Sequence, residues 1–219
     1  MARFCESARN KSTPLGRSSM KNTKVWEIGG LIAGGVMIVF GIVAIFMGVN
    51  GFNTTRDAIK GEGITFGSAD DPAVAKYAEQ WAGEQVTNGD QARAFAKVMR
   101  EHTLESTGGL TYAEMGRFQS ADSPEDPAGT SDDAAAAKDD SGQPVSNGAR
   151  DIWVTETALT TALNVSYMAE RLAVFGLVVG IALLLTGVGL VILALAVFGR
   201  RESVTEPAPA KPSTTPVAG

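Results

Sequence analysis

The stretch LAVFGLVVGIALLLTGVGLVILALAVFG, Leu172 to Gly199, runs for 28 residues without an acidic, basic, Asn or Gln side chain. As a helix it would be about 42 Å long, whereas the hydrocarbon core of a bilayer is roughly 30 Å thick. A helix of a soluble protein rarely runs so far without a polar face. The stretch therefore predicts a transmembrane helix over 172–199.

A second apolar block, Ile28 to Val49, has 22 residues free of charge. It follows a basic leader, and small residues near its end are compatible with a cleaved signal peptide. The apolar core of a signal peptide has only about 7 to 15 residues, however, so the block is better explained as a second transmembrane helix over 25–52. The expected fold is all-α: an integral membrane protein with an antiparallel two-helix transmembrane hairpin and an extracytoplasmic helical module.

The distribution of charge predicts the orientation of this hairpin. Six basic residues precede the first block, and Arg200 and Arg201 follow the second. By the positive-inside rule both termini are cytoplasmic and residues 50–171 are extracytoplasmic, in the plasma membrane. This outer segment carries 10 basic and 20 acidic residues, which disfavours binding to nucleic acid.

Small residues recur every seven positions in both blocks, which keeps them on one face of each helix. In lipid, such residues let two backbones approach closely. Matching depth in an antiparallel pair predicts contacts of Gly34 with Ala194, Gly41 with Gly187, and Gly48 with Gly180, and Ala173 continues the series. Further spaced glycines leave room for self-association.

The remaining segments differ in amino-acid composition. Residues 1–24 form a polar, basic arm expected to be disordered, and the Pro-rich tail 200–219 is expected to be disordered as well. Residues 118–148 are rich in Ser, Asp, Ala, Gly and Pro, with few large apolar groups, and predict a flexible acidic low-complexity loop. Residues 149–171 lack Gly and Pro and keep a helical spacing, so they predict a helical stalk continuous with the second span.

The outer module, 53–117, shows several helix signals. Asp71 and Pro72 mark the start of one helix. Asp90 is a candidate N-cap for a second helix, which has an apolar stripe at Phe95, Val98 and Met99. Gly108 and Gly109 in STGGLTYAEM predict the end of this second helix, followed by a short restart in which Tyr112 anchors the turn.

The candidate chemistry is sparse, because His102 is the single histidine of the chain. A non-haem iron triad requires two histidines, and a hydrolase triad would require a nucleophile motif that the sequence lacks. A metal site of His102 with Glu101, Glu105 or Glu114 has no spacing signature. We therefore predict no catalytic, cofactor-binding or metal residue, and a structural role for His102.

Two stretches, YAEQWAGEQVTNGDQARAFAKVMREHTLESTGGLTYAEM and TALNVSYMAERLAVFGLVVG, together with TTRDAIKGEGITF, resemble a family of actinobacterial two-span membrane proteins of unknown function. Some members are labelled "aromatic ring-opening dioxygenase". That label implies a metal-dependent oxygenase, which the ligand-poor sequence does not support.

Three functional hypotheses remain. The first is a non-catalytic structural or interaction protein of the cell envelope, anchored in the lipid bilayer, with a membrane or envelope protein or a second copy as partner. The second is a metal-dependent enzyme or sensor centred on His102. The third is a small-ligand receptor with a pocket among Tyr77, Trp81, Phe95 and Tyr112.

Overall fold

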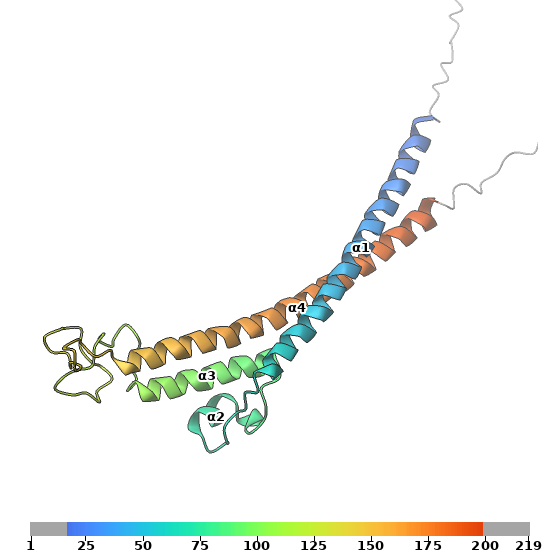
Figure 1. Ribbon diagram of the computed structural model, residues 1–219. Helices are drawn as coiled ribbons and strands as arrows, with labels where there is room; N and C mark the ends of the chain where they lie inside the picture. The colour runs from blue at the N-terminus through green and yellow to red at the C-terminus, as the bar shows by residue number, and fades with distance from the viewer. Residues whose placement is uncertain (1–16, 199–219) are drawn as a thin grey trace, which may run out of the picture. The chain divides into compact units, whose positions relative to one another are not determined.

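The computed structural model describes residues 17–198, and within this range the regular elements are all helices. They are α1 (Arg17–Gly61), α2 (Pro72–Tyr77), the single 3-10 turn η1 (Glu79–Trp81), α3 (Gly89–Ser106) and α4 (Gly148–Phe198) (Figure 1). Residues 17–24, expected to belong to a disordered arm, instead form the start of α1. The arm residues 1–16 and the tail 200–219 lie outside the described range.

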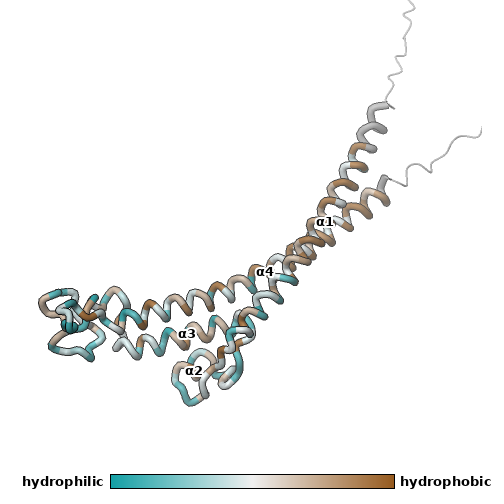
Figure 2. The backbone as a smooth tube through the Cα atoms, in the orientation of Figure 1, coloured by the Kyte–Doolittle hydropathy of each residue, from teal (hydrophilic) through white to brown (hydrophobic). Residues whose placement is uncertain are grey.

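Both long helices contain a part that is long and apolar enough to cross a membrane. The mean hydropathy of the most apolar window is 2.6 in α1 and 2.8 in α4, and 17% of each window is buried. Figure 2 shows this apolar character in the middle of α1 and in the C-terminal half of α4. A core helix of a soluble protein would be mostly buried, so the exposed apolar surface of these helices differs from that of such a core helix.

The described chain divides into two compact units. One, the helix-pair unit, combines the described part of Met1–Val43 with that of Gly180–Gly219, and the other, the module unit, comprises Ala44–Val179. The long helices α1 and α4 contribute to both units.

In the helix-pair unit, α1 and α4 approach closely at glycine. A Cβ atom on Gly34 would lie 2.8 Å from the Gly187 carbonyl oxygen, and one on Gly41 would lie 2.9 Å from that of Gly180. The pairing runs antiparallel, but the register differs from the predicted one by seven residues: Gly34 lies against Gly187 rather than Ala194, which instead faces Gly30. A seven-residue repeat looks the same after a shift of seven, so the sequence pattern cannot distinguish the two registers.

The same shift holds in the module unit. There Gly48 lies against Ala173 and Leu177, with a would-be Cβ atom 2.9 Å from the Ala173 carbonyl oxygen, rather than against Gly180. All seven small residues predicted to mediate packing thus lie between α1 and α4, with altered partners.

Beyond α1 the chain turns at Gly61 and Gly63, and a short extended segment follows. Thr65 forms an isolated bridge with Gln85, flanked by backbone hydrogen bonds from Phe66 N to Glu84 O and from Val86 N to Ile64 O. The Asp71 carboxylate caps α2, as predicted, by accepting from Ala73 N at 2.8 Å. The helix ends early, because Ala78 leaves the helical region at φ −149°.

Asn88, not Asp90, caps α3: its side-chain oxygen accepts from Gln91 N at 3.0 Å. At the other end, Gly108 and Gly109 adopt φ values of 63° and 82°, and Gly109 N donates to Leu104 O. The predicted helix end at this Gly pair is therefore confirmed. The stretch after it forms turns rather than a further helix.

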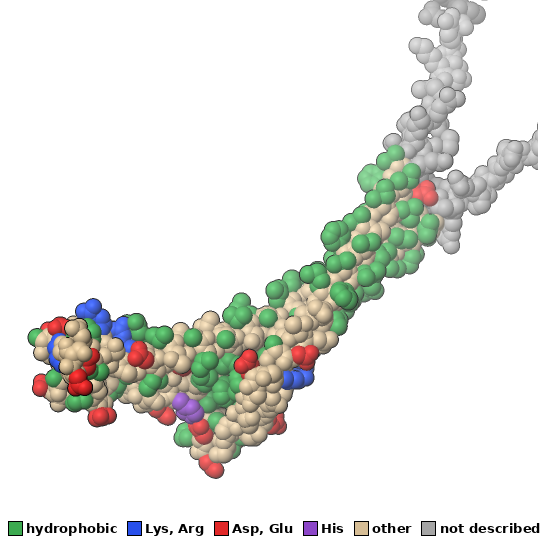
Figure 3. Space-filling model, in the orientation of Figure 1, with side chains coloured by type: hydrophobic (Ala, Val, Ile, Leu, Met, Phe, Trp, Pro, Cys, Tyr) green, Lys and Arg blue, Asp and Glu red, His purple; other side chains and the backbone are tan. Residues whose placement is uncertain are grey.

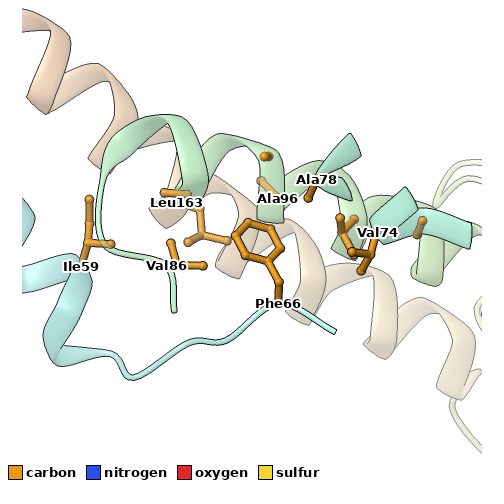
Figure 4. Packing of buried hydrophobic residues seen from close by; sticks show 11 residues of the cluster. Ile59, Phe66, Val74, Ala78, Val86, Ala96 and Leu163 are labelled. Carbon is orange, nitrogen blue, oxygen red and sulfur yellow. The ribbon is translucent and has the colours of Figure 1, made fainter. Parts of the chain in front are cut away.

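The core of the module unit lies where α1, α2, α3 and α4 meet (Figure 4). Phe66 from the extended segment lies at its centre, stacked at 6.1 Å on Trp81 and edge-on at 5.4 Å to Phe95. Around it are mostly small side chains. The buried members are Ile59, Phe66, Ala73, Val74, Ala78, Val86, Ala92, Ala94, Ala96, Val98 and Leu163.

Residues 118–148 differ from the flexible loop predicted by composition. Backbone hydrogen bonds close this segment on itself, including a reciprocal pair between Phe118 and Thr130 and a bond from Gln119 N to Val145 O. The buried Asn147 side chain donates to the carbonyl oxygens of Gly116 and Pro127. Paired backbone groups and one buried amide, rather than apolar burial, hold the segment together, and composition does not reveal such pairing.

α4 starts at Gly148 and continues for 51 residues, in agreement with the predicted stalk that runs into the second span.

The close approach at Gly34 is testable with a neighbouring control. Gly34→Ala places a methyl group in the 2.8 Å gap and should lower the free energy of unfolding by about 1–3 kcal/mol. Gly35→Ala meets nothing within 4 Å and should be neutral or slightly stabilising, since Ala is the better helix former. SDS-induced unfolding of the full chain in mild detergent measures both; equal effects would contradict the observed register.

Candidate functional site

Two carboxylates of α4 are buried, which is unusual for Glu. Glu156 and Glu170 are 4% and 5% exposed and lie on the face of α4 that packs against α3, with Leu163 midway between them in the sequence. Sequence reasoning treated 149–171 as a stalk and did not single them out. The available signal was the seven-residue spacing of Glu156, Leu163 and Glu170.

Glu170 joins three helices. Its carboxylate accepts a hydrogen bond at 2.7 Å from the backbone N–H of Gly89, the first residue of α3, and one at 3.2 Å from the Arg56 guanidinium of α1. The carboxylate thus lies at the positive end of the α3 dipole and beside a cation. The contact requires a glycine, because a Cβ atom on Gly89 would lie 2.9 Å from the Cα atom of Tyr167.

Further polar contacts fix the same end of α3. The Gln91 side-chain oxygen accepts from the backbone N–H and hydroxyl of Thr87 and from the Asn88 amide. The guanidinium of Arg171 pairs with Asp90. The beginning of α3 is therefore held to α4 by both buried and exposed charges.

Glu156 holds the other end of the α3–α4 contact. Its carboxylate pairs at 3.0 Å with Arg100 of α3, whose guanidinium also lies 4.5 Å from the centre of the Trp153 ring. Together, the two carboxylates attach α4 to α3 at points about 21 Å apart along the helix.

His102 lies on α3 at its contact with α2. Its Nε2 atom is 2.9 Å and 3.1 Å from the two carboxylate oxygens of Asp71, the residue that caps α2 (Figure 3 shows the histidine at the surface). The hydrogen bond with His102, followed by those from the α2 backbone, lowers the pKa of Asp71 below its ordinary value. His102 thus connects α3 to the cap of α2.

The acids considered as partners of His102 have other contacts. Glu101 accepts from Lys76 and from the Tyr77 hydroxyl, and the Lys76 hydrogen bond lowers its pKa. Glu114 accepts from the hydroxyl and backbone N–H of Thr111, which likewise lowers its pKa. Within residues 17–198 no cluster of three His, Cys, Asp or Glu residues has metal-binding geometry.

Tyr112 does not join the other aromatic residues of the predicted pocket. It is 41% exposed, and the Arg150 guanidinium at the start of α4 lies 4.0 Å from its ring centre. Tyr77, Trp81 and Phe95 pack against the core instead. The four-residue aromatic pocket is therefore not formed.

One face of α4, the outward face, carries exposed apolar side chains, with the exposed Thr157 and Thr161 between them. We use this name for Val154, Val165, Met168 and Leu172, which are 54%, 57%, 66% and 69% exposed. Their spacing places them on the side of α4 away from Glu156, Leu163 and Glu170. Beside Leu172 and Gly176, an apolar hollow of 430 Å³ extends to Met47 and Gly51 of α1.

The chain matches no protein-family model, no curated protein and no solved structure.

The contacts of Glu170 predict that removing its side chain lowers the stability of the protein strongly. Glu170→Ala leaves the Gly89 N–H and the Arg56 guanidinium without their partner and should lower the free energy of unfolding by about 3–5 kcal/mol. Asp151→Ala, at an exposed acid of the same helix, should change it by less than about 0.5 kcal/mol. Chemical unfolding of the full chain in detergent, followed by the circular dichroism of the helices, compares them; a neutral Glu170→Ala would contradict the assignment.

Proposed function

We propose that the protein is a non-catalytic interaction protein anchored in the plasma membrane. In this proposal α1 and α4 cross the bilayer as an antiparallel pair, both termini are cytoplasmic, and the part of the module unit within residues 50–171 lies outside. Six basic residues before the first apolar block and two directly after the second, against three near the opposite ends of the blocks, support this orientation.

The composition of the apolar blocks disfavours a transport function. Neither 28–49 nor 172–199 contains an acid, a base, an Asn or a Gln. Ion sites and proton relays normally need such groups at membrane depth. The hydroxyl of Thr186 is hydrogen-bonded to the Ala182 carbonyl oxygen of its own helix.

The single observation that carries the proposal is the outward face of α4. Val154, Val165 and Met168 precede the apolar block that begins at Leu172, so they belong to the segment expected outside the hydrocarbon. Exposed apolar side chains grouped on one face mark interaction surfaces in soluble domains. Because Glu156 and Glu170 attach the opposite face of α4 to α3 and α1, this one remains free for a partner.

No specific observation favours a metal-dependent enzyme or sensor. Within the described residues, the carboxylate that contacts His102 is that of Asp71, and it also accepts hydrogen bonds from the α2 backbone. The resemblance to proteins labelled as ring-opening dioxygenases therefore gains no support from the geometry around His102.

Site-specific photocrosslinking in native membranes tests the proposal. A benzophenone amino acid at Val165 should give a product that contains this chain and a second polypeptide, either another copy or a different protein. The same label at Glu79, an exposed position on η1, is the matched control. Adducts with lipid alone, no adduct, or equal protein adducts at both positions would contradict a protein-binding face on α4.

A further inference from the structure

The module unit has an excess of acids, yet three of its cations line one face of α3. Arg93, Lys97 and Arg100 follow each other at spacings of four and three residues, which aligns them along the helix. They border two adjoining grooves, which share Tyr77, Arg93 and Lys97.

The two grooves have complementary linings. The first, of 450 Å³, adds Gln80, Trp81 and the Asp90 carboxylate, and the second, of 330 Å³, adds Arg100, Thr160 and Asn164. Cations, aromatic side chains and neutral hydrogen-bonding groups therefore line two neighbouring grooves beside α3, the first of which also includes the Asp90 carboxylate.

The acids around these grooves are already engaged. Asp90 pairs with Arg171, Glu156 with Arg100, and Glu101 with Lys76 and Tyr77. Arg93 and Lys97, by contrast, form no ion pair among the described residues, and their cationic groups lie 4.8 Å and 6.0 Å from the ring centres of Tyr167 and Tyr77. Two cations are thus left without a carboxylate in a module where acids are twice as frequent as bases.

We infer that this double groove is a binding site for an organic phosphate. Arg93 and Lys97 would hold the phosphate, since guanidinium and ammonium groups form charge-assisted hydrogen bonds with its oxygens. Tyr77 and Trp81 provide an apolar wall for the adjoining ring or chain of the ligand, and Gln80 and Asn164 provide hydrogen-bonding groups for its hydroxyls.

Two sources can supply this chemistry: a soluble sugar phosphate or the head group of an anionic phospholipid. The acidic module as a whole repels anions, but at physiological ionic strength charges beyond about 8 Å are largely screened, so the nearby cations dominate. The site is separate from the outward face of α4 and does not depend on the protein partner proposed for it.

The test uses the full chain in nanodiscs. In one arm the nanodiscs contain phosphatidylcholine alone, and glucose 1-phosphate is titrated by calorimetry; in the other, native mass spectrometry counts phosphatidylglycerol molecules retained from mixed nanodiscs. We expect saturable binding in at least one arm, and the responding arm identifies the source. Arg93→Gln/Lys97→Gln should weaken this binding about tenfold or more, because it removes both charge-assisted contacts.

The matched control is Lys60→Gln/Arg117→Gln, which removes the same charge from exposed positions elsewhere in the module unit. It should leave the affinity within about twofold of the original. Circular dichroism of all variants excludes unfolding as the cause of a loss. Absence of binding in both arms, or an equal loss in the control, would overturn the inference.

Discussion

The carboxylate of Glu170 is the interaction on which the arrangement of the module unit depends. It contacts the first backbone N–H of α3 and the guanidinium of Arg56 on α1 while itself belonging to α4. A buried carboxylate is stable only when its charge is compensated, and here a helix terminus and a cation provide the compensation. Loss of either partner leaves a charge in the interior, so the three helices are held as a set.

The direction of α4 follows from this constraint. Glu156 and Glu170 both face α3. The exposed apolar residues on the other side of α4 have no partner within the described chain. In the proposed topology, the 51-residue helix α4 would connect a partner bound to that face directly to the membrane span. The proposed anchoring and interaction role rests on these features. His102 connects α3 to the cap of α2.

Local signals in the sequence were sufficient for much of the fold. The two long apolar helices, the cap at Asp71, the helix end at Gly108 and the continuous helix from Gly148 all follow from charge, spacing and capping chemistry.

The register of α1 against α4 did not follow, because a seven-residue repeat of small residues is unchanged by a shift of seven. The folded segment 118–148 and the junction at Glu170 were missed for a related reason: both depend on pairing between groups far apart in the chain, which composition and periodicity do not encode. The prediction of an aromatic pocket was wrong because Tyr112 contacts Arg150 rather than the core.

The most direct test of this account is the hydrogen exchange of the Gly89 amide. As the first residue of α3, Gly89 has no hydrogen-bond acceptor within its own helix, and such amides ordinarily exchange quickly. Because this N–H donates to the buried Glu170 carboxylate, we predict protection comparable to that of the buried α3 amides of Ala92 and Ala96. Glu170→Ala removes the acceptor and should abolish this protection beyond any loss at those two positions. Rapid exchange at Gly89 in the unaltered protein would contradict the three-helix junction and, with it, the exposure of the outward face of α4.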